Sequence, residues 1–513
     1  MLGDDRPVRR NQLWAAAFVI VAAGIVATHI VGLATAPLGL YNDEASIGYN
    51  AWTIAHYGTD QYGTHWPLLF RDFGDYKGPV STYLLAPLTL VLPLTPAVTR
   101  LPSAFAGIAM SLVAGWLAWR VTRSRPVALL VMLEAAFEPW FFHTARIALE
   151  ADLFTVLCFV TVLAALAGGG ALRARNCVIA GVALGLAPLA AQPGRFFAVV
   201  FLVLLVATHY RSLQRVRVAL LGLPVLVTTL ILLVGTSGGA TARLGDVSVF
   251  SHNSVLRGVA AWISNYFQYF NPDFLFLHGD PNPRHATGFG GMLFVTTVPV
   301  LIAGLVRCIR QWRDPLCQLA LAGLLVVPVG PALTGGISAR RDIIFLPFLI
   351  VVLTYGWQGA TTFLRGHRVR IAIAAVLTAT AVGLYYVDYA VAYPTRSAVA
   401  FYAGEEAAFV AAHSAAGTHN ILVSRRILDA LEEALFAIQP APGGAEVLTR
   451  MHTVDLASPS QIQQAQPGDV AVLDGAEPSP GGFTLIDHEA VTGPTSIGGP
   501  STTLVLVNVY QRR

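Results

Sequence analysis

Charged side chains are scarce in this chain: Asp, Glu, Lys and Arg make up 12% of its 513 residues, whereas 55% are hydrophobic. Together with a mean hydropathy of +0.61, this composition excludes an ordinary soluble globular protein. The formal net charge of +4 is too small for this length to indicate nucleic-acid binding. We therefore expect a polytopic α-helical membrane protein.

Cysteine is also rare, and each of the four residues lies within or beside an apolar segment: Cys158, Cys177, Cys308 and Cys317. No pair falls in a presumed external loop, so a disulfide is not expected there. Internal repeats and low-complexity stretches are not evident either.

Long apolar segments alternate with short basic clusters along most of the chain. Measured against the roughly 20 residues that cross a bilayer, about eleven segments read as spans, several of them short enough to require bending or tilting. They lie at about 12–36, 102–119, 126–142, 151–170, 177–192, 195–209, 218–235, 289–306, 316–334, 342–360 and 371–391. The first reads as a signal anchor rather than a cleaved signal peptide.

Arginine clusters fall in every second connection between these segments, which places those connections and the N-terminus in the cytoplasm. This topology requires the Pro-rich segment at about 79–98 to stay at the outer interface or to re-enter. We therefore divide the chain into a membrane domain (1–391) and a small external α/β domain (392–513), with external loops at 37–101 and 236–288. The tail has a helical pattern near 427–438 and strand patterns at 421–424, 470–473 and 503–510.

The first external loop carries an acidic pair, Asp43 and Glu44, just beyond the first span, followed by Lys77 amid many aromatic residues. Carboxylates at a membrane surface are candidates for acid/base work, and a lysine can neutralise a phosphate. For the aromatic residues, an interfacial helix with rings at headgroup level explains the pattern equally well.

Further polar groups occur at the mouths of later spans. One set contains His143, Arg146, Glu150 and Asp152, although Arg146 and Glu150 have the spacing of a simple helical ion pair. Glu134 and Glu138 share one face of the preceding span, and we expect them to face a cavity. Arg284 and His285 lie in a Gly/Pro-rich turn, and Arg340 and Arg341 break the positive-inside rule, which indicates an external anion.

Three strings carry a resemblance to a known family: YNDEASIGYNAW, GTHWPLLFRDFGDYKGPVSTYL and TRLPSAFAG. Their order resembles the first external loop and second span of the protein O-mannosyltransferase and lipid A aminoarabinose transferase superfamily, which has the GT-C fold. FHTARIALEADLF and GDPNPRH resemble bacterial members, so the resemblance covers roughly residues 12–390.

The resemblance implies roles for individual residues. Asp43 corresponds to the catalytic base with Glu44 beside it, and Lys77 to a lysine that contacts the donor phosphate. Tyr76 and Gly78 depart from the family's His-Lys-Pro-Pro pattern, which puts a role for that histidine in doubt. The second acidic site corresponds to Glu150 or Asp152, and both remain open. Further phosphate or sugar contacts are implied for Arg284, His285 and Arg341.

The resulting hypothesis is a multi-pass enzyme of the inner (plasma) membrane that transfers a sugar from a polyprenyl-phosphate donor, with inversion. The acceptor would be a hydroxyl of an envelope glycolipid, glycan or protein on the external face. Phosphate and carboxylates together are compatible with a divalent metal, but no ligand set with diagnostic spacing occurs. The alternative is a transporter or flippase of lipid-linked sugars, which the absence of repeats disfavours.

Overall fold

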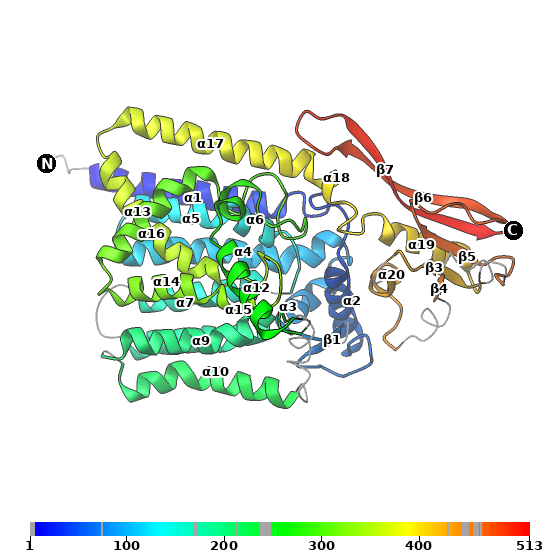
Figure 1. Cartoon of the computed structure of the whole chain (residues 1–513), viewed down its shortest axis with the longest axis horizontal. Coiled ribbons are helices and arrows are strands. Elements are labelled where there is room, and N and C mark those ends of the chain that lie inside the picture. The colour runs from blue at the N-terminus through cyan, green and yellow to red at the C-terminus, as the bar shows by residue number, and fades with distance from the viewer. Residues whose placement is uncertain are drawn as a thin grey trace.

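The computed structural model describes residues 6–72, 75–150, 152–167, 173–211, 213–235, 248–251, 253–427, 430–443, 451–454, 461 and 464–513. A bundle of roughly parallel helices is followed by a small domain containing a sheet (Figure 1). This domain lies beyond one end of the bundle, away from the N-terminus (Figure 1). We call that end of the bundle the domain-side end.

Each of the predicted spans is helical in the structure. The bundle consists of α1 (Arg6–Ile30), α4 (Pro96–Thr122), α5 (Arg125–Phe137), α6 (Pro139–Ala145), α7 (Asp152–Leu166), α8 (Ala174–Ala190), α9 (Gln192–His209), α10 (Arg215–Gly235), α13 (Val298–Arg310), α14 (Pro315–Val326), α15 (Val329–Ala332), α16 (Phe345–Leu364) and α17 (Arg368–Val391). Among the described residues, six helices are long and apolar enough to cross a membrane alone. The count of eleven crossings therefore stays a prediction.

The predicted span at 126–142 is not one straight helix. α5 and α6 meet at an angle of 58°. Glu138 has an extended backbone (φ −59°, ψ 139°) because the next residue is Pro139, which disfavours the helical conformation before it. If this bent pair is one span, it is the seventh candidate.

Small residues let the bundle helices approach closely. A Cβ added to Gly304 of α13 would lie 2.1 Å from the carbonyl oxygen of Val352 in α16, and one added to Gly356 would lie 2.1 Å from that of Val300. Larger side chains at either glycine would push the two helices apart. The four cysteines are free and buried within the bundle.

Two helices and a hairpin lie at the domain-side end, between α1 and α4 (Figure 1). They are α2 (Asn42–Tyr57), β1 (Phe70–Asp72), β2 (Asp75–Lys77) and α3 (Val80–Thr89). α3 has ten residues, about half of the ~20 that cross a bilayer, as expected for a segment that does not cross. α2 ends where Gly58 adopts a left-handed conformation (φ 71°).

The predicted loop at 236–288 is partly described. It contains α12 (Val255–Gln268) and η2 (Asp273–Leu277), and η3 (Val295–Thr297) precedes α13. Residues 236–247 and 252 lie outside the described residues.

The C-terminal domain has a five-stranded sheet in the order β4-β3-β5-β7-β6. β3 is parallel to β4 and β5, and β7 is antiparallel to β5 and β6. The elements are α18 (Tyr393–Ser397), α19 (Glu405–Ala416), β3 (Ile421–Ser424), α20 (Ala430–Ile438), β4 (Met451–Val454), β5 (Val470–Asp474), β6 (Phe483–Pro494) and β7 (Ser501–Arg512). The three predicted strands and the helix are confirmed, whereas β4, β6 and α19 had not been predicted.

α20 docks the domain on α2. The aromatic ring of Phe436 packs where a Cβ on Gly48 would lie 2.6 Å away, so this close contact requires glycine. The Tyr49 hydroxyl donates to the carbonyl of Pro440 at 2.7 Å.

Candidate active site

Asp43 lies in the first turn of α2, at the domain-side end of the bundle. The side chain of Glu44 accepts a hydrogen bond from the backbone N–H of Tyr41 at 3.1 Å, which caps the helix and sets its start. The Asp43 side chain is 13% exposed, and its Oδ1 accepts from Lys77 Nζ at 2.6 Å. The acid of the predicted pair that meets a cation at an accessible surface is therefore Asp43.

Lys77 reaches Asp43 from the β1–β2 hairpin, which pairs Phe70 with Lys77. Lys77 also forms an ion pair with Asp72 of β1, and its side chain is only 9% exposed. Burial opposes the charged ammonium, but the carboxylates of Asp43 and Asp72 outweigh it and raise the pKa of Lys77. Lys77 is therefore held as a buried cation between two carboxylates.

Gly78 explains one departure from the family pattern. A Cβ at this position would lie 2.3 Å from the carbonyl oxygen of Leu189, so only glycine fits between the hairpin and α8. The neighbouring Tyr76 contributes its carbonyl, which accepts a hydrogen bond from Arg195 of α9 at 2.6 Å. The backbone around Lys77 is thus anchored to two bundle helices.

Arg340 joins the two acidic regions that the sequence indicated separately. Its Nη1 lies 3.4 Å from Asp43 Oδ2, its Nε lies 3.2 Å from Asp152 Oδ2, and its Nη2 lies 3.8 Å from Glu150 Oε1. The Arg340 side chain is 27% exposed. Asp43, Lys77, Glu150, Asp152 and Arg340 thus form one cluster, which we call the Asp43 cluster.

Glu44 lies next to this cluster but is fully buried. Arg100 of α4 donates to both of its oxygens, at 2.8 Å and 2.9 Å, and the backbone N–H of Ala148 donates at 2.8 Å. Arg100 also donates to the carbonyls of Leu33, Pro37 and Gly39. Glu44 therefore ties α2 to α4 and to the segment that carries Glu150.

The helical ion pair between Arg146 and Glu150 is not formed. α6 ends at Ala145, and Glu150 has a positive φ of 53°, so the two residues do not share a helical face. Glu150 instead accepts from the backbone N–H of Gln192 at 3.1 Å, in addition to its contact with Arg340. Arg146 is buried and donates to the carbonyls of Thr28, His29 and Ala36.

The other predicted residues make contacts outside the Asp43 cluster. His143 is buried against the carbonyl of Arg284 (3.1 Å), and the Arg284 guanidinium stacks 3.7 Å above the ring of Tyr41. Arg341 donates to the carbonyls of Thr334 and Gly335, both at 2.8 Å. Of the two adjacent arginines, Arg340 rather than Arg341 therefore belongs to the cluster.

His285 acts on the cluster indirectly. Its Nδ1 lies 2.9 Å from Asp280 Oδ2, and the same oxygen accepts from the backbone N–H of Ala339 at 2.7 Å. Because Ala339 precedes Arg340, the buried carboxylate of Asp280 anchors the turn that presents the arginine.

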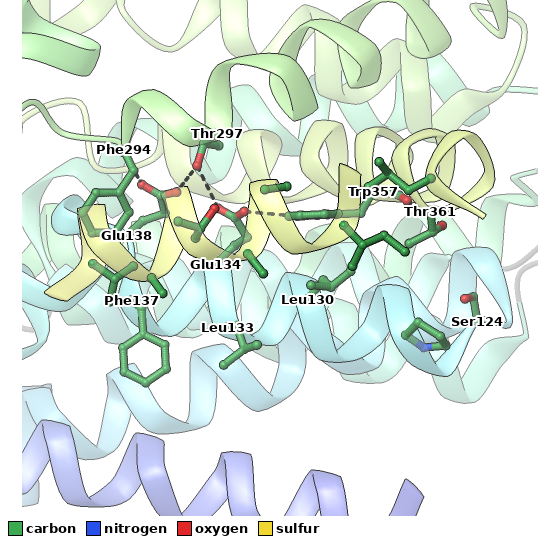
Figure 2. A pocket seen from close by; sticks show the side chains of 18 of the residues that line it. Ser124, Leu130, Leu133, Glu134, Phe137, Glu138, Phe294, Thr297, Trp357 and Thr361 are labelled. Carbon is green, nitrogen blue, oxygen red and sulfur yellow. Dashed lines mark hydrogen bonds between the residues drawn. The ribbon is translucent and has the colours of Figure 1, made fainter. Parts of the chain in front are cut away.

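Glu134 and Glu138 face a cavity, as expected, but this cavity is separate from the Asp43 cluster. The cavity has a volume of about 940 Å³ and is lined mainly by apolar residues of α5, α16 and α17. Figure 2 shows both carboxylates directed toward Thr297 and Trp357. Glu138 also accepts from the backbone N–H of Phe294 at 2.7 Å, which holds the start of η3 against the bend after α5.

A divalent metal finds little support in the geometry. Among the described residues, no group of three or more His, Cys, Asp or Glu side chains is placed to hold a metal ion. The carboxylates of the Asp43 cluster converge on Lys77 and Arg340 instead.

Comparisons with known proteins were made by sequence and by structure. No protein-family model and no curated protein matches the chain. The structure is similar to ArnT from Cupriavidus metallidurans in the apo state, with a TM-score of 0.54 and 18% identity over 90% of this chain and 93% of that one.

Two further solved structures have bound lipids. ArnT from Cupriavidus metallidurans bound to undecaprenyl phosphate has a TM-score of 0.53 and 15% identity, and the match covers 96% of this chain and 98% of that one. The archaeal oligosaccharyltransferase AglB from Archaeoglobus fulgidus, in complex with an inhibitory peptide and a dolichol-phosphate, has a TM-score of 0.53 and 13% identity over 90% of this chain and 70% of that one. The chain therefore has the GT-C glycosyltransferase fold.

Proposed function

We propose that this chain is a membrane glycosyltransferase that moves a sugar from a polyprenyl-phosphate donor to an acceptor hydroxyl on the external face of the membrane. The observation that carries the proposal is the placement of Asp43 between two cations, Lys77 at 2.6 Å and Arg340 at 3.4 Å. A carboxylate beside two cations offers a proton acceptor and an anion site within one group of side chains. The structural neighbours crystallised with undecaprenyl phosphate and dolichol-phosphate support a lipid-phosphate donor.

In the proposed reaction, the acceptor oxygen attacks the anomeric carbon of the donor sugar, and its proton passes to Asp43. The bond between that carbon and the phosphate oxygen breaks, and the polyprenyl phosphate leaves with the electron pair. Direct displacement inverts the anomeric configuration. Arg340, whose side chain is 27% exposed, and Lys77 would stabilise the charge that develops on the departing phosphate.

Donor binding would also activate Asp43. In the structure, the cations that the phosphate needs are ion-paired with Asp43, Asp72 and Asp152. A phosphate that draws Lys77 and Arg340 toward itself weakens their hold on Asp43, which then becomes a better proton acceptor. Glu44 has both oxygens occupied by Arg100 and backbone N–H groups, so we assign it a positioning role.

The test is sugar release from a panel of polyprenyl-phosphate sugars by purified protein, comparing wild type with Asp43→Asn and Lys77→Ala. Arg71→Ala removes an exposed positive charge from the neighbouring strand β1 and is the matched control. We expect turnover by wild type and Arg71→Ala, and its collapse in the two cluster variants. Donor binding without turnover in any acceptor extract, unchanged in Asp43→Asn, would refute the enzyme and favour a lipid-linked sugar transporter.

A further inference from the structure

A second cavity lies between the bundle and the C-terminal domain. It has a volume of about 750 Å³ and is lined by the segment before α2, by α19 and α20, and by β6 and β7. Gly404 allows this assembly: a Cβ there would lie 2.6 Å from the Cβ of Glu489, and its φ is +86°. A volume of this size is typical of small-molecule sites. The residues of the Asp43 cluster are not among those that line it.

The charge of this interdomain cavity has a single sign. Four carboxylates line it, from three different elements: Glu406 of α19, Glu433 of α20, and Asp487 and Glu489 of β6. None of the described lining residues is Lys, Arg or His. His488, between the two β6 acids, is exposed and does not line the cavity. An anionic ligand, including a polyprenyl phosphate, is therefore disfavoured here.

Glu433 is the unusual member of this set. Its side chain lies in the inner wall with 0% exposure, and neither carboxylate oxygen has a hydrogen-bond partner among the described residues. Burial raises the pKa of Glu433 well above its ordinary value, and the neighbouring acids Glu405, Glu406, Glu44 and Glu432 add to this shift. A buried carboxyl without a partner costs the protein stability unless something supplies the missing positive charge.

The arrangement also indicates what kind of cation fits. No group of three or more described His, Cys, Asp or Glu side chains is placed to hold a metal ion, because these carboxylates stand on separate walls. Between them lies an apolar floor that includes Leu38, Leu40, Val410, Val491 and Leu506. Positive charges that are spaced along a hydrocarbon skeleton match both features.

We propose that the interdomain cavity binds a small organic polyamine, with its ammonium groups at Glu406, Glu489 and Asp487 and its methylene segments on the apolar floor. Ammonium groups are donors without acceptors, so they suit a wall of carboxylates. This proposal does not depend on the transferase activity, since the cavity and the Asp43 cluster use different residues.

The test is calorimetric titration of the purified full-length protein in detergent with spermidine at neutral pH. The site variant is Glu406→Gln with Glu489→Gln, two partly exposed residues whose amide forms keep the side-chain shape. The control is Asp273→Asn, which removes a charge that is 54% exposed and lies outside the cavity. We expect binding with one site per chain, weakened about tenfold or more in the site variant and unchanged in the control, where tenfold is ~1.4 kcal/mol.

Two comparisons keep the result decisive. The single variants Glu406→Gln and Glu489→Gln are titrated as well, so that a folding defect of the double variant does not decide the outcome. Titration with 1,4-butanediol and with 1,4-diaminobutane separates charge recognition from filling of an apolar space. Equal affinity for the diol and the diamine, or spermidine binding that is unchanged in all site variants, would overturn the proposal.

Discussion

Replacing Arg340 tests the Asp43 cluster most directly, because the neighbouring residue is also an arginine. Arg340 contacts Asp43, Glu150 and Asp152 at 3.2 to 3.8 Å, whereas Arg341 donates to the carbonyls of Thr334 and Gly335. Arg340→Ala and Arg341→Ala therefore remove the same charge at adjacent positions, but only the first removes it from the proposed phosphate site.

The size of the effect follows from the geometry. At an effective dielectric constant of about 20, one charge pair at ~3.5 Å is worth roughly 4–5 kcal/mol before desolvation, which offsets much of it. For a preorganised group that stabilises developing charge, the remaining benefit is about 2.7–4 kcal/mol, or ~10²–10³ in kcat. Arg340→Ala should lower sugar release by this factor, and Arg341→Ala should lower it by less than about threefold, as for removal of an ordinary surface contact.

The assay measures initial rates of sugar release at saturating donor, with the melting temperature of each variant recorded in the same detergent. Arg340→Lys is the third variant: it keeps the charge, but one ammonium cannot reach three carboxylates as the guanidinium does, so an intermediate rate is expected. If Arg340→Ala and Arg341→Ala lose equal activity, or if the loss follows the melting temperature alone, the assignment of Arg340 is wrong.

Three further predictions concern single carboxyl groups. Asp43→Asn should reduce turnover by ~10²–10⁴ while donor affinity, measured by titration, changes little; an active variant would exclude Asp43 as the base. Glu44→Gln should lower the free energy of unfolding by about 3–5 kcal/mol, since it leaves Arg100 buried without its anion, and an unchanged melting temperature would contradict this. Because the pKa of Glu433 is raised in the folded state, its carboxyl favours folding at acidic pH, and this contribution is lost as the pH rises above the ordinary value of 4.5. Glu433→Gln should therefore melt higher than wild type at mildly alkaline pH but not at acidic pH, and a difference independent of pH would argue against a buried titrating group.

Most bundle helices could be predicted from the sequence because the length of an apolar segment is a local property. The bend at Glu138 was missed although Pro139 signals it, since the apolar pattern continues on both sides. β6 was missed for another reason: its side chains alternate between exposed and half-buried, so no buried face appears in the sequence. It is held by its ladder with β7, a contact that local pattern does not predict.

The site was predictable in part, and the limits are physical. Asp43, Lys77, Glu150 and Asp152 were all identified, but as separate motifs, because nothing in one sequence states that they share a cation. Choosing Arg341 over Arg340 was the consequence: both arginines break the positive-inside rule, and only a tertiary contact distinguishes them. That contact is the carboxylate of Asp280, which accepts from the N–H of Ala339.

The same contact gives the site a testable logic. The cluster draws on four distant parts of the chain, and each part is held by a group that does not itself belong to the cluster: Arg100 beneath Glu44, Gln192 beside Glu150, and Asp280 behind Ala339. Precise placement of charge is what an electrostatic mechanism requires, since a preorganised cation costs no reorganisation when the phosphate departs. The supporting groups are therefore as necessary to the proposed chemistry as Asp43 itself, although they need not touch a substrate.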